Sequence, residues 1–119
     1  MLKPPFTRVT VDGNRLTDWD AFHNTFAETF GFPSFYGRNM NAWIDCMSSL
    51  DAPEDSMSTI HAPDGGIVLL EILHVEEFAL RHRELYDAVV GASAFVNYRK
   101  VDVGEAPVLA LSFHHYARI

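Results

Sequence analysis

Two nearly continuous aliphatic runs constrain the fold of this chain more than any other feature. Residues 67–73 read Ile-Val-Leu-Leu-Glu-Ile-Leu, and residues 108–113 read Val-Leu-Ala-Leu-Ser-Phe. Runs of this length and composition are typical of strands that are covered on both faces, as in parallel sheets. The chain between them has helical spacing, so we expect right-handed crossovers and a small parallel sheet in a two-layer or three-layer α/β fold.

The remaining elements follow from apolar spacing and from residues that start or end helices. We expect a strand over 6–11 and helices over about 19–30, 39–50, 75–81 and 84–98. Thr17 to Asp20 resembles a capping box at the start of the first helix, and Gly31 ends that helix. The stretch 51–66, rich in Pro and Gly, predicts a long loop. The prediction is a single domain over residues 1–119 with a small three-stranded parallel sheet packed with helices, in the order β-α-α-β-α-α-β.

Charge excludes one large class of partners. Nine Lys and Arg residues stand against sixteen Asp and Glu residues, which gives a formal net charge of −7. A protein that neutralises phosphates along DNA or RNA needs the opposite sign. We therefore expect no direct binding of nucleic acid.

The cysteine count and the first residues indicate the compartment. Cys46 is the single cysteine and has no partner for an internal disulfide, and it lies beside the apolar stripe of a predicted helix. We interpret it as a half-buried structural thiol. Residues 1–6 carry one basic residue and no apolar run of signal-peptide length, and no segment reaches the roughly 20 apolar residues of a membrane span. These features predict a cytoplasmic protein without a membrane partner.

The acidic residues are unevenly distributed. The 42 residues between Arg38 and Arg81 contain no Lys or Arg and eight acids. One interpretation is an electronegative face that attracts a basic partner, and the other is a surface that keeps the protein soluble. Charge alone favours the second interpretation.

No arrangement of residues in this sequence supports catalysis or a metal centre. Gly65 and Gly66 precede a predicted strand, whereas a phosphate-binding loop follows one. No serine lies in a nucleophile elbow. His114 and His115 are consecutive on a strand, so their side chains point to opposite faces and do not readily share an ion. We expect no catalytic residue, no metal and no cofactor.

The segment 35–47, Phe-Tyr-Gly-Arg-Asn-Met-Asn-Ala-Trp-Ile-Asp-Cys-Met, combines an apolar loop with a helix that carries one outward carboxylate. It resembles the barstar family of intracellular ribonuclease inhibitors, in which the stretch has the pattern Pro-x-Tyr-Tyr-Gly-x-Asn-x-Asp-Ala-x-Trp-Asp-Cys. The motif covers about fifteen residues. The predicted order of elements also agrees with the three-stranded parallel sheet of that family.

The resemblance implies a partner-binding role for specific positions. Asp45 corresponds to the principal acid of the family, which enters the ribonuclease active site where a substrate phosphate would lie. The other implied contacts are positions of the same loop and helix: Phe35, Tyr36, Gly37, Asn39, Met40, Asn41, Ile44, Ser48 and Ser49. Phe35 lacks a tyrosine hydroxyl, Asn41 replaces a second acid, and Ile44 replaces a tryptophan. These departures indicate a ribonuclease other than barnase.

Each of these residues also has a purely structural interpretation. Phe35 and Tyr36 fit a core, and Gly37 fits a turn with positive φ. Asn39 fits a helix cap, whereas Asp45 fits a solvated helix face. Trp43 falls on the inward stripe, and we assign it to the core.

Two functions remain. The first is an inhibitor that occludes a basic endoribonuclease in a one-to-one complex, with a possible role as an immunity protein against a nuclease toxin; it needs no cofactor. The second is a small α/β enzyme or ligand-binding domain in which residues 32–37, the aromatic loop, form a pocket wall and His74, His82 or His114 is an acid–base group. The resemblance favours the inhibitor.

Overall fold

The three predicted strands form one parallel sheet in the order β1-β2-β3, in a computed structural model that describes residues 5–114. In chain order the elements are β1 (Phe6–Asp12), the 3-10 turn η1 (Gly13–Arg15), α1 (Trp19–Phe30), α2 (Met40–Ser48), the 3-10 turn η2 (Pro53–Asp55), β2 (Ile67–Leu73), α3 (Val75–Arg81), α4 (Arg83–Asp102) and β3 (Leu109–Phe113). The predicted α/β class and the order β-α-α-β-α-α-β are confirmed.

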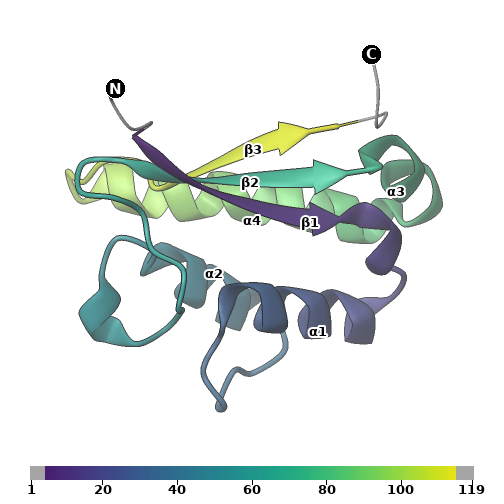
Figure 1. Ribbon diagram of the computed structural model, residues 1–119, viewed down its shortest axis with the longest axis horizontal. Helices are drawn as coiled ribbons and strands as arrows, with labels where there is room; N and C mark the ends of the chain where they lie inside the picture. The colour runs from purple at the N-terminus through teal and green to yellow at the C-terminus, as the bar shows by residue number, and fades with distance from the viewer. Residues whose placement is uncertain (1–4, 115–119) are drawn as a thin grey trace.

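In the part of the chain that the structure describes, helices cover one face of the sheet. α1, α2 and α4 lie on the same side of it (Figure 1). Along β2, the buried Val68, Leu70 and Ile72 alternate with half-buried neighbours. The expectation that the aliphatic runs are covered on both faces is wrong, because the outer face of β2 carries half-buried aliphatic side chains and Glu71 without a second helical layer. The arrangement therefore has two layers.

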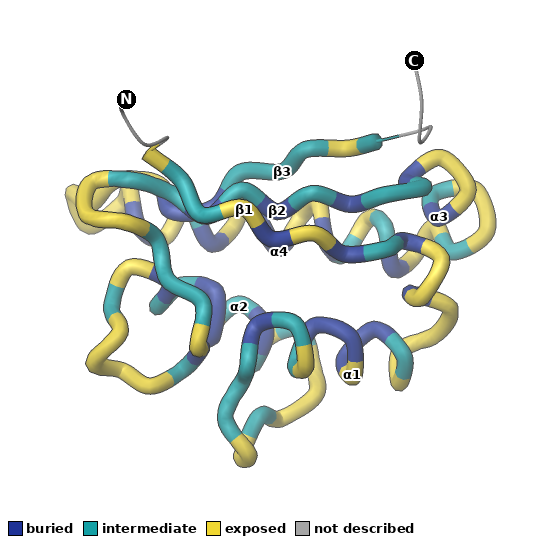
Figure 2. The backbone as a smooth tube through the Cα atoms, in the orientation of Figure 1, coloured by how far each residue is buried: buried dark blue, intermediate teal, exposed yellow. Residues whose placement is uncertain are grey.

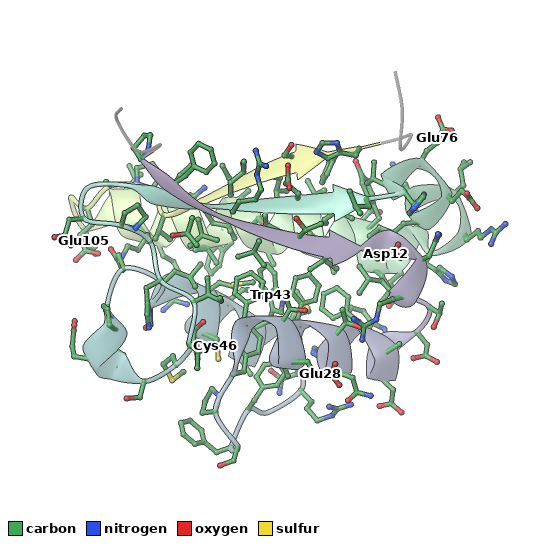
Figure 3. All side chains as sticks on the ribbon, in the orientation of Figure 1. Asp12, Glu28, Trp43, Cys46, Glu76 and Glu105 are labelled. Atoms are coloured by element: carbon green, nitrogen blue, oxygen red, sulfur yellow. The ribbon has the colours of Figure 1, made fainter. Side chains whose placement is uncertain are left out.

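Aromatic side chains fill the space between the two layers. Phe22, Phe26 and Phe30 of α1 are fully buried, and Phe26 meets the Trp43 ring of α2 edge-on with 5.6 Å between centroids. Trp43 lies between the helices and the sheet (Figure 3), where the sequence places it. Figure 2 shows the same division, with buried positions along the strands and on α1 and α2. α2 is thus anchored by one face and presents the other outward.

α1 begins one residue later than a capping box at Thr17 implies. The Oδ1 atom of Asp18 accepts a hydrogen bond from the backbone N–H of Ala21 at 2.7 Å, so Asp18 is the N-cap. A carboxylate at this position also interacts favourably with the positive, N-terminal end of the helix dipole. Gly31 ends the helix with φ +64, and a side chain there would collide with Thr59 of the long loop. Glycine at position 31 is therefore required twice, by conformation and by space.

α4 is longer than predicted. It continues past the predicted end at residue 98 to Asp102, because no glycine or proline occurs between that position and Gly104, which has φ +83. The Asn97 side chain donates to the carbonyl of Leu109 at 2.7 Å and accepts from the N–H groups of Val108 and Leu109, which ties α4 to the start of β3. No helix within residues 5–114 is both long and apolar enough to cross a membrane.

The loop 51–66 is fastened to the helices rather than free. The Ser58 hydroxyl donates to the carbonyl of Phe30 at 2.7 Å, and the Ala62 N–H donates to the carbonyl of Leu50 at 2.8 Å. Thr7 of β1 donates to the His61 carbonyl at 2.7 Å. The loop therefore bridges the ends of α1 and α2 and the start of the sheet.

Candidate protein-binding site

In the loop between α1 and α2, two neighbouring aromatic residues differ in their exposure to solvent. Phe35 is 74% exposed, so its structural interpretation as a core residue is wrong. Tyr36 is half-buried against the core, and its hydroxyl hydrogen-bonds to Nδ1 of His23 at 2.6 Å. The bond between Tyr36 and His23 fixes the loop against α1. In this conformation the Phe35 ring points into solvent and does not pack on the core.

His23 and Arg38 support this loop, and sequence analysis missed both. Burial, together with the nearby Arg38 guanidinium, lowers the pKa of His23. Burial likewise raises the pKa of the Tyr36 phenol. Both groups are consequently neutral near pH 7, which suits a buried hydrogen bond. Arg38 donates to Asn24 at 2.8 Å and pairs with Asp20 at 3.3 Å, closing the loop from its exposed side.

The left-handed backbone of this loop lies at Arg38 and not at Gly37. Arg38 has φ +55, whereas Gly37 is outside the positive-φ region, so the predicted positive φ at Gly37 is wrong. The bonds from Arg38 to α1 hold the strained residue in place. A Cβ atom on Gly37 would lie 3.4 Å from both Ala42 and Asn39, which is a close but ordinary contact.

One face of α2 packs against the core, and the opposite face is exposed to solvent. Asn39 is the N-cap, as predicted, and its Oδ1 atom accepts from the Ala42 N–H at 2.8 Å. Met40 and Ile44 are half-buried and pack against the core. Asn41 and Asp45 are exposed, so the helix displays an amide and a carboxylate one turn apart.

Asp45 is paired within the chain. Its Oδ1 atom lies 3.1 Å from Nη1 of Arg99 in α4, and the two side chains are 59% and 44% exposed. The partner is 54 residues away in sequence, and no local pattern around α2 signals it.

Residues 39–80, the cation-free interval, do not form a uniform negative surface, because the fold places Lys or Arg side chains beside several of their acids. Asp51 lies 2.8 Å from the buried Lys100, which also binds Glu105 at 3.0 Å. Burial by itself lowers the pKa of Lys100, but its hydrogen bonds to Asp51 and Glu105 raise it overall. The negative charge near the C-terminal end of α2 is therefore partly neutralised by α4.

Ser48 and Ser49 are occupied by intramolecular bonds. The Ser48 hydroxyl donates to the Ile44 carbonyl at 2.7 Å, one turn back in α2. The Ser49 hydroxyl donates to Oδ2 of Asp55 in η2 at 2.8 Å. Both residues are half-buried, and the Ser49 bond links the end of α2 to the long loop.

A hollow of about 150 Å³ lies between the aromatic loop, α2 and the long loop 51–66. Its walls come from three segments, namely Pro33, Phe35, Tyr36 and Gly37, then Ala42, Asp45 and Cys46, and finally Met57. Cys46 is almost wholly buried, more deeply than the predicted half-buried thiol, and burial together with the Asp45 charge raises its pKa to about 11. A thiol in this state packs and is a poor nucleophile.

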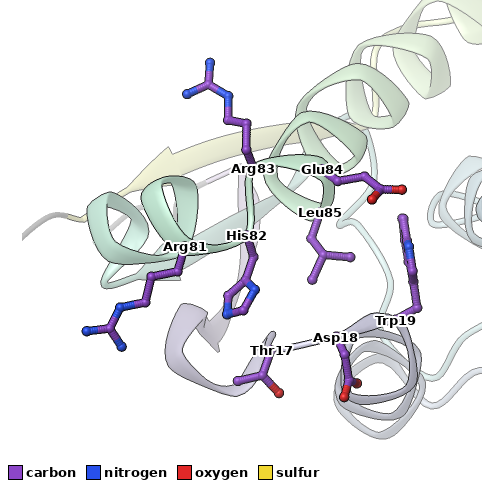
Figure 4. A pocket seen from close by; sticks show the side chains of 8 residues that line it. All are labelled: Thr17, Asp18, Trp19, Arg81, His82, Arg83, Glu84 and Leu85. Atoms are coloured by element: carbon purple, nitrogen blue, oxygen red, sulfur yellow. The ribbon is translucent and has the colours of Figure 1, made fainter.

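The histidines invoked for an enzyme lie away from this hollow. His82 is in a separate hollow between the start of α1 and the α3–α4 junction, where it points toward Thr17 (Figure 4). His74 occupies the N-cap of α3, and Nε2 of His114 lies 3.3 Å from Oε2 of Glu71 on the outer sheet face. None of the three lines the aromatic loop, and His115 is outside the described residues. Within 5–114, no group of three or more His, Cys, Asp or Glu side chains is placed to hold a metal ion.

Comparison with protein-family models matches residues 6–100 to the family described as Barstar (barnase inhibitor). This range contains 95 of the 119 residues. The chain belongs to the barstar family. The matched range includes α1, the aromatic loop, α2 and α4 as far as Arg99 and Lys100, and it ends before β3. Comparison with curated protein sequences finds no match.

Proposed function

We propose that this member of the barstar family is an intracellular, single-domain inhibitor of a basic endoribonuclease, which it binds one to one. The observation that carries the proposal is the family match over residues 6–100, because the family is one of ribonuclease inhibitors. The inhibitor occludes the active site with α2 and the preceding loop. It acts without cofactor or turnover, and it serves as an immunity protein in a cell that produces the nuclease as a toxin.

The exposure of Asp45 and Phe35 supports this mode of inhibition. The active site of a ribonuclease is cationic because it binds a polyanion, and a carboxylate on a rigid helix can replace a substrate phosphate. Asp45 is 59% exposed on α2, and Phe35 is 74% exposed across the same hollow. An exposed aromatic ring next to an acid supplies apolar contact area beside the charge.

The proposed contact residues divide into two groups by exposure. The exposed group meets the enzyme directly and consists of Phe35, Gly37, Asn39, Asn41 and Asp45. The half-buried group shapes and stiffens the surface and consists of Tyr36, Met40, Ile44, Ser48 and Ser49. Pre-organisation of this kind reduces the entropy cost of binding.

Titration against ribonucleases tests the proposal, with basic toxin nucleases as the first set and barnase as a further probe. We expect RNA cleavage to fall to zero at one equivalent of inhibitor, and we expect no cleavage by the inhibitor alone. Asp45→Ala should weaken inhibition. Asp87→Ala is its matched control, because Asp87 is also exposed and paired with an arginine at 3.1 Å, but lies near the start of α4. Persistent RNA cleavage by a ribonuclease shown to be saturated with the protein would contradict occlusion.

A further inference from the structure

The acid on which the proposed function depends already has a cation of its own. Arg99 approaches Asp45 from α4, and both side chains are largely exposed to solvent. A guanidinium has five N–H donors, and a carboxylate has two oxygens. Within residues 5–114, a single hydrogen bond joins the two groups, from Nη1 of Arg99 to Oδ1 of Asp45. The pair therefore retains donors and acceptors that face solvent.

Arg99 is held where it is by its neighbour in sequence. Lys100 is buried and binds Asp51 at 2.8 Å and Glu105 at 3.0 Å, and its Nζ atom also lies 3.4 Å from the Ser48 carbonyl. These contacts fasten the last turns of α4 to the end of α2. Because the α4 backbone is fixed there, Arg99 is kept within reach of Asp45, to which its Nη1 atom donates at 3.1 Å.

A cation that approaches Asp45 meets the field of Arg99 at the same time. The attraction to the carboxylate is offset by repulsion from the guanidinium, so a surface that offers only positive charge gains little at this point. A surface that also places an acceptor opposite Arg99 satisfies both groups. An arrangement that penalises the wrong partner in this way produces specificity, not raw affinity.

We propose that Arg99 is a specificity-determining residue of the candidate site, which selects a ribonuclease presenting a carboxylate or another acceptor beside the cation that binds Asp45, against surfaces that offer cations alone. This inference rests on the proposed function. It adds a chemical description of the partner that neither the motif in α2 nor the family match contains. It also assigns a role to a residue outside the loop and helix from which the site was built.

The test compares Arg99→Gln with Arg83→Gln on a probe that carries only cations, a nona-arginine peptide. Arg83 is the matched control because it is an exposed α4 arginine paired with Asp87 at the same distance of 3.1 Å, and its replacement changes the net charge equally. We expect Arg99→Gln to tighten peptide binding about threefold to fivefold more than Arg83→Gln does, the range expected of an exposed ion pair. The excess should vanish in the double variant Asp45→Asn with Arg99→Gln. Equal effects of the two arginine variants would overturn the inference.

The second arm uses barnase or whichever toxin nuclease the inhibition titration shows to be bound. With that enzyme, Arg99→Gln should lower the affinity, because the acceptor opposite Arg99 loses its cation, while Arg83→Gln should leave it nearly unchanged. A gain of affinity equal to that seen with nona-arginine would overturn the selection for an acceptor. If no ribonuclease binds the wild-type protein, the proposed function fails, whereas the peptide arm still decides whether Arg99 screens Asp45.

Discussion

Two acids from the same cation-free interval, Asp45 and Glu71, are used in different ways. Glu71 lies on the outer face of β2 with a side chain only 13% exposed, and it contacts Arg8 at 3.5 Å, Thr10 at 3.0 Å and His114 at 3.3 Å. Asp45 pairs with one residue within 5–114, namely Arg99, and its side chain is 59% exposed. The first carboxylate is enclosed by neighbours from β1 and by the residue that follows β3, and the second remains open on one side. Partner number and exposure, not local sequence charge, therefore separate a structural acid from a candidate binding acid.

The largest expected effect comes from Asp45→Ala on the complex with the ribonuclease. Truncating one partner of a desolvated interface ion pair costs about 2 to 5 kcal/mol of binding free energy. The free protein should lose no more than about 0.5 kcal/mol of unfolding free energy, because the pair with Arg99 is exposed. Isothermal titration and urea unfolding measure the two quantities. A large loss of stability with unchanged affinity would make Asp45 a structural acid like Glu71.

Glu71→Ala should show the opposite pattern. We expect the unfolding free energy to fall by about 1 to 2 kcal/mol, since three hydrogen-bonding or charged neighbours lose a mostly buried carboxylate. Affinity for the ribonuclease should stay within experimental error of wild type, because the outer sheet face carries none of the proposed contact residues. Urea unfolding and titration calorimetry on one preparation give both values. A drop in affinity without loss of stability would place the partner on the sheet.

Salt should affect association more than dissociation. The net charge of −7 attracts a basic partner at long range, but Arg99 and Lys100 neutralise part of the field near α2. The Debye length shrinks from about 30 Å at 0.01 M to about 8 Å at 0.15 M ionic strength. We expect the association rate to fall about threefold to tenfold over this range, with dissociation changing less. Stopped-flow mixing measures both rates, and an association rate independent of salt would mean that the acids only keep the protein soluble.

Acidification should loosen the aromatic loop, which is the smallest effect. The pKa of His23 is lowered in the folded protein from its ordinary value of 6.5. The unfolded chain therefore binds a proton more readily, and the stability that neutral His23 contributes is present above pH 6.5 and is lost as the pH falls below it. Urea unfolding between pH 7.5 and pH 5 should show this loss, and the part due to the imidazole should be absent in His23→Gln. If His23→Gln lost as much stability on acidification as the wild-type protein does, the loss would belong to other titratable groups.

Local patterns predicted the elements because their causes are local. The aliphatic run 67–73 became a strand, and the three- and four-residue spacing around Trp43 placed its ring in the core. The identity of Asn39 as an N-cap likewise depends on its own side chain and the next turn. Features of this kind are encoded within a few residues, so a single sequence reveals them.

The missed contacts join residues far apart in sequence. Arg99 is 54 residues from Asp45, and the bond between His23 and Tyr36 joins a helix to a loop. The positive φ at Arg38 depends on bonds to α1, whereas the adjacent glycine was the natural prediction from propensity alone. Periodicity identifies which face of an element is apolar, but not which charged group the tertiary fold places against its other face.

Pairing between β1 and β2 has a consequence for how this protein reaches its folded state. Phe6 pairs with Ile67, so forming this ladder closes a loop of about sixty residues that contains the aromatic loop and α2. Contacts of such long range slow folding, because the chain loses loop-closure entropy before the ladder compensates for it. During synthesis, α2 leaves the ribosome well before the strand that completes its support. Under the proposed immunity role, protection of the producing cell depends on the rate of that closure as well as on the affinity of the finished surface.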